Sequence, residues 1–136
     1  MVFFSAHKHQ RLAEILQRVQ KAIEEAGGDL EWVEEELAEA ARVAGFDLEI
    51  ARLVDGPTLE TVLGAGEGGA PGRCWLAAET LFADGLVAQA EGREEEARDR
   101  LEKARRLYGK LGGDLHLPHQ AASLEERLER IGELLG

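Results

Sequence analysis

The stretch AETLFADGLVAQAEGREEEARDRLEKA, residues 78–104, places small residues at regular intervals in a segment that is otherwise rich in charge. Gly85, Ala97 and Ala104 are spaced so that they fall where two consecutive helices would meet. At such crossings, closely packed helices leave no room for a side chain larger than a methyl group. The stretch therefore predicts two antiparallel helices in near contact, with Gly92 in the turn between them.

Helical periodicity continues on the N-terminal side of this stretch. Apolar residues recur at helical spacing over residues 6–26 and again over 30–44, with charged residues on the other faces. Gly45 is expected to end the second helix, and Asp47 to cap a short third one. Pro57 suits the first turn of a short fourth helix, because proline lacks an N–H that would be unpaired there in any case.

The remaining pattern is also helical. Residues 74–91 and 93 to about 108 are expected to form the two helices of the opening stretch, and Ser123 with Glu126 forms a capping box that predicts the start of a last helix. The acidic start and basic end of the second of these helices match the sign of the backbone dipole at each terminus.

No segment alternates with the two-residue period of a strand, so the predicted class is all-α, a bundle of about six or seven helices. A glycine-rich segment, residues 64–73, is expected to be a flexible loop between an N-terminal helical half and a C-terminal half. Residues 1–136 are expected to form a single domain, since a chain of this length supports one core.

The opening stretch resembles a tetratricopeptide repeat (TPR), a helix-turn-helix unit of ~34 residues, over about residues 78–111. The resemblance rests on the small residues named above and on four more: Ala78, Glu79, Glu96 and Lys103. Five positions depart from the family pattern, where larger, apolar or turn-forming residues are usual: Leu81, Asp84, Ala88, Leu101 and Gly109. More loosely, the layout resembles an uncharacterised class of bacterial helical proteins with one such hairpin, on the basis of AGFDLEIARLVDGPTLETVLG, residues 44–64.

One repeat cannot bury its face alone, and stacks of such units usually need about three copies. The other helices of the chain, or a second subunit, must therefore supply the missing neighbours. The resemblance also implies that the first helix of the hairpin projects side chains onto a concave, peptide-binding side. These candidate partner-binding residues are Glu79, Phe82, Leu86 and Gln89.

Composition limits the classes of partner. The formal net charge of −11 argues against nucleic acid, whose binding depends on clustered Lys and Arg. The first 16 residues contain neither a signal peptide nor a membrane span, and the single cysteine, Cys74, excludes an intrachain disulfide. These features favour a cytoplasmic protein without a membrane partner. Asn is absent, which is compatible with a thermophilic source and equally with GC-rich codon usage.

Motifs that could carry chemistry each have a simpler interpretation. His116 and His119 have a zinc-ligand spacing, but Pro118 lies between them and favours a loop. The GxGxxG pattern that begins at Gly64 lacks the preceding strand of a nucleotide site. Cys74 has no neighbouring His to act as a base, so a structural cysteine is the simpler interpretation.

The sequence therefore predicts a non-catalytic module for protein interaction or self-assembly, with no catalytic residue, metal or cofactor. The proposed contact is an apolar face around Phe82 and Leu86 that docks a helix, a peptide or a second copy. The alternative is a small metal- or ligand-binding protein or enzyme that uses His116, His119 and nearby carboxylates.

Overall fold

The computed structural model describes residues 6–25, 30–63, 71–111 and 118–136, with helix side chains omitted at 6–13, 20, 44, 71, 72 and 118–123. Within these ranges the chain is all-helical, which confirms the predicted class. Seven helices are described: α1 (Ala6–Glu24), α2 (Glu31–Ala44), α3 (Leu48–Leu53), α4 (Gly56–Leu63), α5 (Pro71–Ala90), α6 (Glu94–Lys110) and α7 (Pro118–Leu135).

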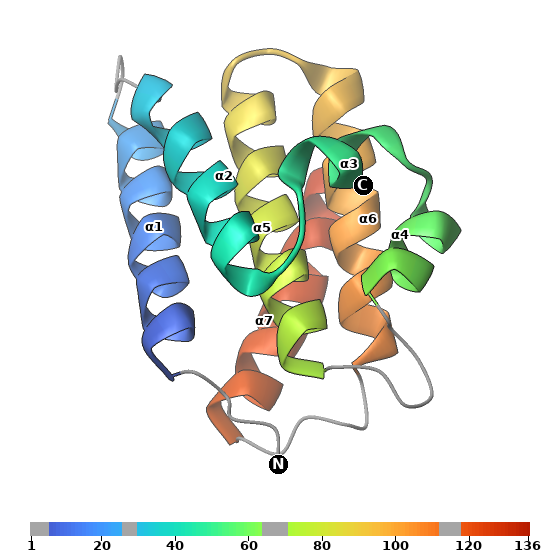
Figure 1. Ribbon diagram of the computed structural model, residues 1–136. Coiled ribbons are helices and arrows are strands. Elements are labelled where there is room, and N and C mark those ends of the chain that lie inside the picture. Colours follow the sequence, from blue (N-terminus) through green and yellow to red (C-terminus); the bar gives the residue numbers. More distant parts are fainter. Residues whose placement is uncertain (1–5, 26–29, 64–70, 112–117) are drawn as a thin grey trace.

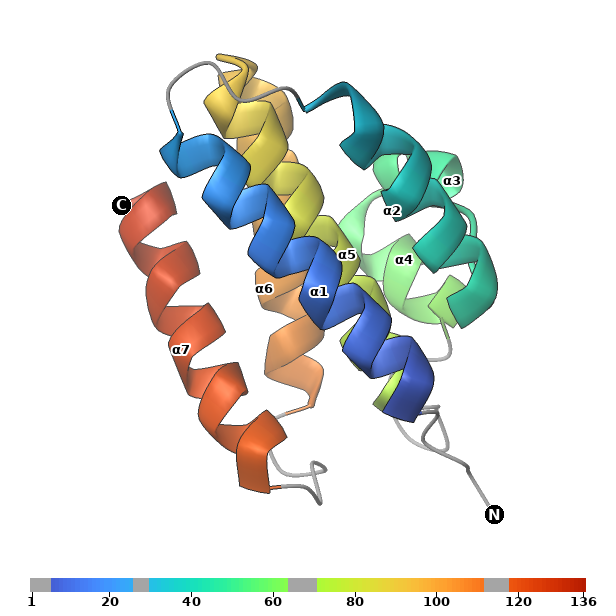
Figure 2. The same cartoon turned by 90° about the vertical axis from the view of Figure 1, so that its left-hand side faces the viewer.

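The longer helices form two antiparallel pairs and a closing helix (Figure 1). Helix α5 lies at the centre, packed against α1 and α2 on one side and against α6 on the other. Helix α7 packs on α6 and runs in the same direction as α5, as the turned view in Figure 2 also shows. The chain itself therefore supplies neighbours to the hairpin formed by α5 and α6.

The central position of α5 explains its composition. Every residue from Cys74 to Ala88 is buried, and all except Glu79, Thr80 and Asp84 are apolar or glycine. A helix that is apolar on all sides must be covered on all sides. None of the helices within the described ranges has the length and apolarity that a bilayer crossing requires.

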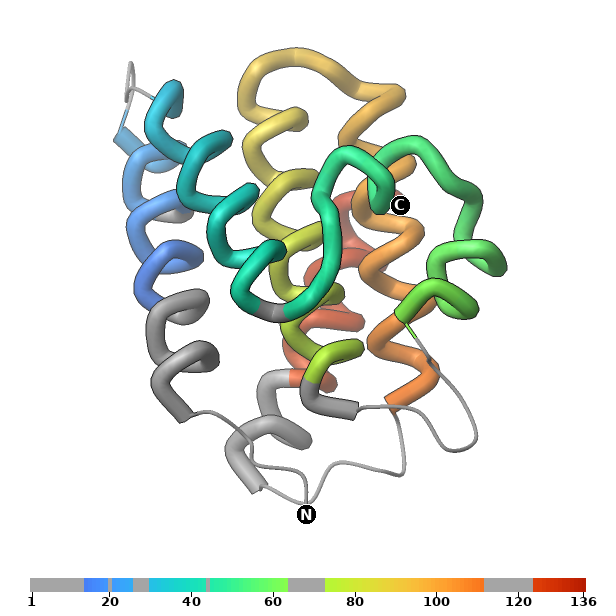
Figure 3. The backbone as a smooth tube through the Cα atoms, viewed as in Figure 1, coloured from blue at the N-terminus to red at the C-terminus, as the bar shows by residue number. Residues whose placement is uncertain are grey.

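Local signals define several helix ends as expected. Gly45 adopts a left-handed conformation with φ of 93° and ends α2. The Asp47 carboxylate accepts a hydrogen bond of 3.1 Å from the backbone N–H of Ile50 and caps α3. Asp55 does the same for α4, accepting 2.7 Å from the N–H of Thr58. Figure 3 traces the chain through these turns, from α2 through α3 to α4, which packs on α6.

The predicted close contact between α5 and α6 is confirmed. A Cβ atom added at Gly85 would lie 2.8 Å from Cγ and Cδ2 of Leu101, closer than packed carbon atoms approach. Ala97 and Ala104, on the facing helix, are also buried. Gly92 adopts φ of 78° in the turn between α5 and α6, which favours glycine there.

Two predicted boundaries are wrong. The glycine-rich loop was expected to extend to residue 73, but α5 already begins at Pro71. The last helix was expected to begin at the Ser123–Glu126 capping box, but α7 begins at Pro118. The physical reason is the same in both cases, because proline suits the first position of a helix, where its missing N–H costs nothing. The rest of the loop, residues 64–70, lies outside the described residues.

Candidate functional site

The predicted partner-binding residues lie on α5, but three of the four are buried. Phe82 is 0% exposed, Glu79 5% and Leu86 6%, so the expectation of an exposed apolar patch around Phe82 and Leu86 is wrong. The reason is that α1 packs on α5, while α7 places the guanidinium of Arg127 5.0 Å from the centre of the Phe82 ring. Gln89, near the end of α5, is exposed as expected.

A first buried polar cluster, the Glu79 cluster, joins three helices through Glu79 of α5, Tyr108 of α6 and Arg127 of α7. The Glu79 carboxylate accepts hydrogen bonds from the Tyr108 hydroxyl and, at 3.0 Å, from Nε of Arg127. Burial, together with the negative charge of Glu79, raises the pKa of Tyr108 well above its usual value. Burial by itself would lower the pKa of Arg127, but the charge and hydrogen bond of Glu79, together with Tyr108, outweigh burial and raise it. Tyr108 is therefore neutral and Arg127 charged at neutral pH.

A second polar cluster, the Asp84 cluster, is centred on the buried Asp84 of α5 and includes Arg52 of α3, Arg100 of α6 and the exposed Glu34 of α2. Asp84 accepts hydrogen bonds from Nε and Nη2 of Arg52 at 2.9 and 2.7 Å, and from Nε of Arg100 at 3.2 Å. Arg52 also donates two bonds of 2.7 Å to Glu34 of α2. These bonds raise the pKa of Arg52 and lower that of Glu34. Because the bonded residues come from α2, α3, α5 and α6, the cluster links these four helices.

Lys103 of α6 fixes the position of α3. Its buried ammonium donates to the carbonyl oxygens of Ala51 and Arg52 at 3.1 and 2.9 Å, and to the Asp99 carboxylate at 2.9 Å. The last carbonyls of a helix lack partners within it, so a cation is favourable there. All three potential N–H bonds of Lys103 are used, which assigns the side chain a structural role.

Sequence reasoning did not predict these clusters. The one available signal is that Glu79 and Asp84 interrupt an otherwise apolar segment, and that Asp84 occupies a position where the repeat pattern prefers leucine. A carboxylate in such a segment needs a cation when it is buried. The sequence does not indicate which of its arginines supplies that cation.

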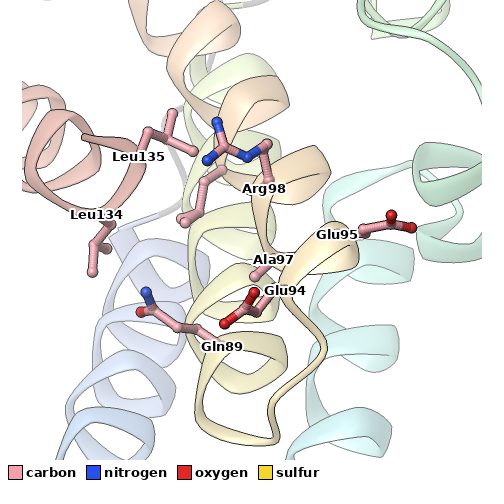
Figure 4. Close-up of a pocket in the computed structure, with 8 residues that line it drawn as sticks. Gln89, Glu94, Glu95, Ala97, Arg98, Leu134 and Leu135 are labelled. Atoms are coloured by element: carbon pink, nitrogen blue, oxygen red, sulfur yellow. The ribbon is translucent and has the colours of Figure 1, made fainter.

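A groove opens at the end of the α5–α6 hairpin beside the C-terminal part of α7 (Figure 4). Its volume is about 390 Å³. Leu134 and Leu135 of α7 form one side, and Gln89 and Arg98 lie on the other, with Arg98 extending toward Leu135 (Figure 4). The remaining lining residues are Glu94, Glu95, Ala97 and Leu101. The groove thus combines partly exposed leucines with a polar rim that is acidic at Glu94 and Glu95.

A second hollow lies beside the same helix, near Phe82. It has a volume of about 300 Å³ and is wide open to solvent. Its lining comes from Phe82 and from α7: Glu126, Arg127, Glu129, Arg130 and Glu133. Helix α7 is therefore bordered by open space both near Phe82 and at the Gln89 end of α5.

The candidates for chemistry find no support among the described side chains. Burial, and then the charge of Glu60, raise the pKa of the Cys74 thiol to about 11, and the thiol donates to the Leu107 carbonyl oxygen at 3.7 Å. Such a thiol is a poor nucleophile at neutral pH. No group of three or more metal-ligating side chains exists within the described residues. The HxxH prediction lies outside them, because His116 and the side chain of His119 are not described.

Comparison with known proteins gives no match. No family model, no curated protein and no solved structure is significantly similar to this chain.

Proposed function

We propose that this chain is a non-catalytic protein-interaction domain that binds a segment of a partner protein in the groove beside α7. The observation that supports the proposal is the groove itself, which leaves Leu134 and Leu135 partly exposed next to Gln89. Partly exposed leucines in a hollow of this size are typical of surfaces that receive an apolar side chain. Gln89 is the one predicted partner-binding residue that lines it.

The expected partner segment is basic and amphipathic. The chain carries a net charge of −11, and the charged residues that line the groove are two carboxylates, Glu94 and Glu95, and one cation, Arg98. A partner with Lys or Arg beside its apolar residue would be attracted over a distance and oriented at the rim. The resemblance of the α5–α6 hairpin to a tetratricopeptide repeat supports the same class of function, although the groove lies at the end of the predicted peptide face.

The experiment is selection of random 16-residue peptides against the wild-type chain, followed by affinity measurement with two matched variants. Leu134→Lys places a charge in the groove, and Ile50→Lys makes the same change at α3, where Ile50 is 47% exposed. Selected peptides should be rich in Lys, Arg and Leu. They should bind Leu134→Lys at least about tenfold more weakly, which is ~1.4 kcal/mol, and bind Ile50→Lys as the wild type.

Peptides that bind both variants equally, or the absence of any selected peptide, would contradict the proposal. Circular dichroism of both variants shows whether each retains its helical fold, so that a loss of binding at Leu134→Lys is not mistaken for unfolding.

A further inference from the structure

We propose that Arg98 makes the groove specific for a segment that carries a carboxylate beside its apolar residue, in addition to the basic residues that face Glu94 and Glu95. This specificity rests on the proposed function and names the partner chemistry of the same groove. The carboxylate belongs to an Asp or Glu side chain or to the C-terminus of the segment, since a guanidinium binds both in the same way. A purely basic segment is therefore a weaker partner than one with a carboxylate in register.

Arg98 is the one cation among the described residues that line the groove, and its charge is free to bind a partner. Most arginines with described side chains form an ion pair with a carboxylate, including the exposed Arg42 and Arg130. For Arg98 the described residues supply no ion pair and no hydrogen bond, although the chain has 27 acidic and 16 basic residues. An unpaired guanidinium that borders a hollow can donate to an acceptor that enters it.

The direction of the Arg98 side chain explains why it does not pair within α6. Glu94 lies four residues earlier on the same helix, and side chains at this spacing are neighbours that commonly pair. Figure 4 shows Arg98 extending instead toward Leu135 of α7. Leu134 and Leu135 are the partly exposed leucines that would contact an apolar side chain of the partner. The groove therefore presents a guanidinium next to its apolar wall.

The opposite charges of the groove are separated along α6. A rise of ~1.5 Å per residue places Glu94 and Arg98 about 6 Å apart along the helix axis. A partner helix presents residues four positions apart at nearly the same distance, so a basic residue and a carboxylate at this spacing meet Glu94 and Arg98 together. The reversed order would bring like charges together, and the pattern therefore also selects the direction in which the segment binds.

The test uses the full chain and those peptides, selected on the wild type, whose binding Leu134→Lys weakens. Each peptide is compared in three forms: unchanged, with Asp and Glu replaced by Asn and Gln, and with an amidated C-terminus. Fluorescence anisotropy measures the affinity of each form for the wild type, Arg98→Gln and Arg105→Gln. Arg105 is the matched control, because it is an exposed arginine of α6 that lines a different hollow, beside the start of α4. Both variants change the net charge by the same amount.

The unchanged peptides should bind Arg98→Gln about fivefold more weakly than the wild type and should bind Arg105→Gln as the wild type. The effect is moderate because Arg98 is exposed, and an ion pair open to water contributes little to affinity. Removal of the peptide carboxylate should weaken binding to the wild type and to Arg105→Gln about fivefold. The same removal should cause no loss with Arg98→Gln, where the donor is already absent. The peptide form that loses affinity shows whether a side chain or the C-terminus supplies the carboxylate.

Two outcomes overturn the inference while the proposed function survives. If neither replacement nor amidation weakens binding to the wild type, the groove recognises basic and apolar residues alone. If loss of the carboxylate weakens binding to Arg98→Gln as much as to the wild type, a group other than Arg98 binds it. If Leu134→Lys weakens no selected peptide, the proposed function fails and the specificity assigned to Arg98 fails with it.

Discussion

The Glu79 cluster and the Asp84 cluster lie five residues apart on α5, yet they are built differently. Asp84 is held by two arginines, of which Arg52 makes paired bonds to it and to Glu34. Glu79 has one arginine, Arg127, which remains 22% exposed, and one neutral donor, the Tyr108 hydroxyl. The Asp84 cluster joins helices that are adjacent in the core, and the Glu79 cluster attaches α7. The difference indicates that the polar contacts of α3 to the hairpin are stronger than those of α7.

The largest expected effect is the difference in the free energy of unfolding between a variant of the Asp84 cluster and a variant of the Glu79 cluster. Arg52→Ala leaves the buried Asp84 with Arg100 alone, so we expect the free energy of unfolding to fall by about 3 kcal/mol. Arg127→Ala enlarges the open hollow beside Phe82, so that water can reach the Glu79 carboxylate in place of the guanidinium, and Tyr108 still donates to it; we expect a loss of about 1 kcal/mol. Urea unfolding followed by tryptophan fluorescence measures both losses. If the free energy of unfolding falls more in Arg127→Ala than in Arg52→Ala, the Glu79 cluster contributes more to stability than the Asp84 cluster, and the comparison is wrong.

A smaller effect tests the α5–α6 contact beside Asp84. In Gly85→Ala the new methyl group meets Leu101 at 2.8 Å and Cβ of Arg100 at 3.4 Å, which strains the Arg100 side of the Asp84 cluster. We expect a net loss of about 1–2 kcal/mol. Gly109→Ala is the matched control on α6, because its added Cβ meets nothing within 4 Å, and it should stabilise by about 0.5 kcal/mol. Thermal unfolding measures the stability of both variants relative to the wild type. If both variants are stabilised, or both destabilised, the result would argue against close packing at Gly85.

The smallest effect concerns acid stability. Hydrogen bonds from Arg52 lower the pKa of Glu34 below its usual 4.5, so this contribution to stability is present above about pH 4.5 and is lost as the pH falls through the folded-state pKa. Glu34→Gln should flatten the loss of stability between pH 5 and 3 by less than about 1 kcal/mol, since the side chain is mostly exposed. Urea titrations at several pH values measure the slope, with the adjacent Glu35→Gln as a control for the loss of one charge. If the dependence of the unfolding free energy on pH is unchanged in Glu34→Gln, the ion pair of Glu34 with Arg52 does not contribute to stability.

Much of the fold follows from local sequence, and the clusters do not. The helical class, the left-handed Gly45, the Asp47 cap and the contact at Gly85 were all predictable, since each depends on residues a few positions apart or on a size limit at a helix crossing. Partners such as Arg52 and Asp84 are 32 residues apart, and Glu79 and Arg127 are 48 apart. Nothing in the spacing of such residues selects one arginine from the others.

The candidate site shows the same division. The predicted peptide face of Glu79, Phe82, Leu86 and Gln89 does lie along one helix, but only Gln89 is exposed. The error concerns burial, because a sequence pattern identifies the residues on one face of a helix and does not identify what covers that face. Here α1 and Arg127 of α7 cover that face, and the capping-box pattern also misplaced the start of α7, which lies at Pro118.

The sequence by itself determined that this chain is helical, where most helices begin and end, and that two of them approach closely at Gly85. These properties depend on the 3.6-residue period, on caps and on side-chain size, which act over short distances along the chain. Only the tertiary structure decided that Glu79 and Asp84 are buried, which arginines neutralise them, and that a groove remains beside α7. The reason is that burial and ion pairing depend on how distant helices are placed around α5, and that placement is a property of the whole packed chain.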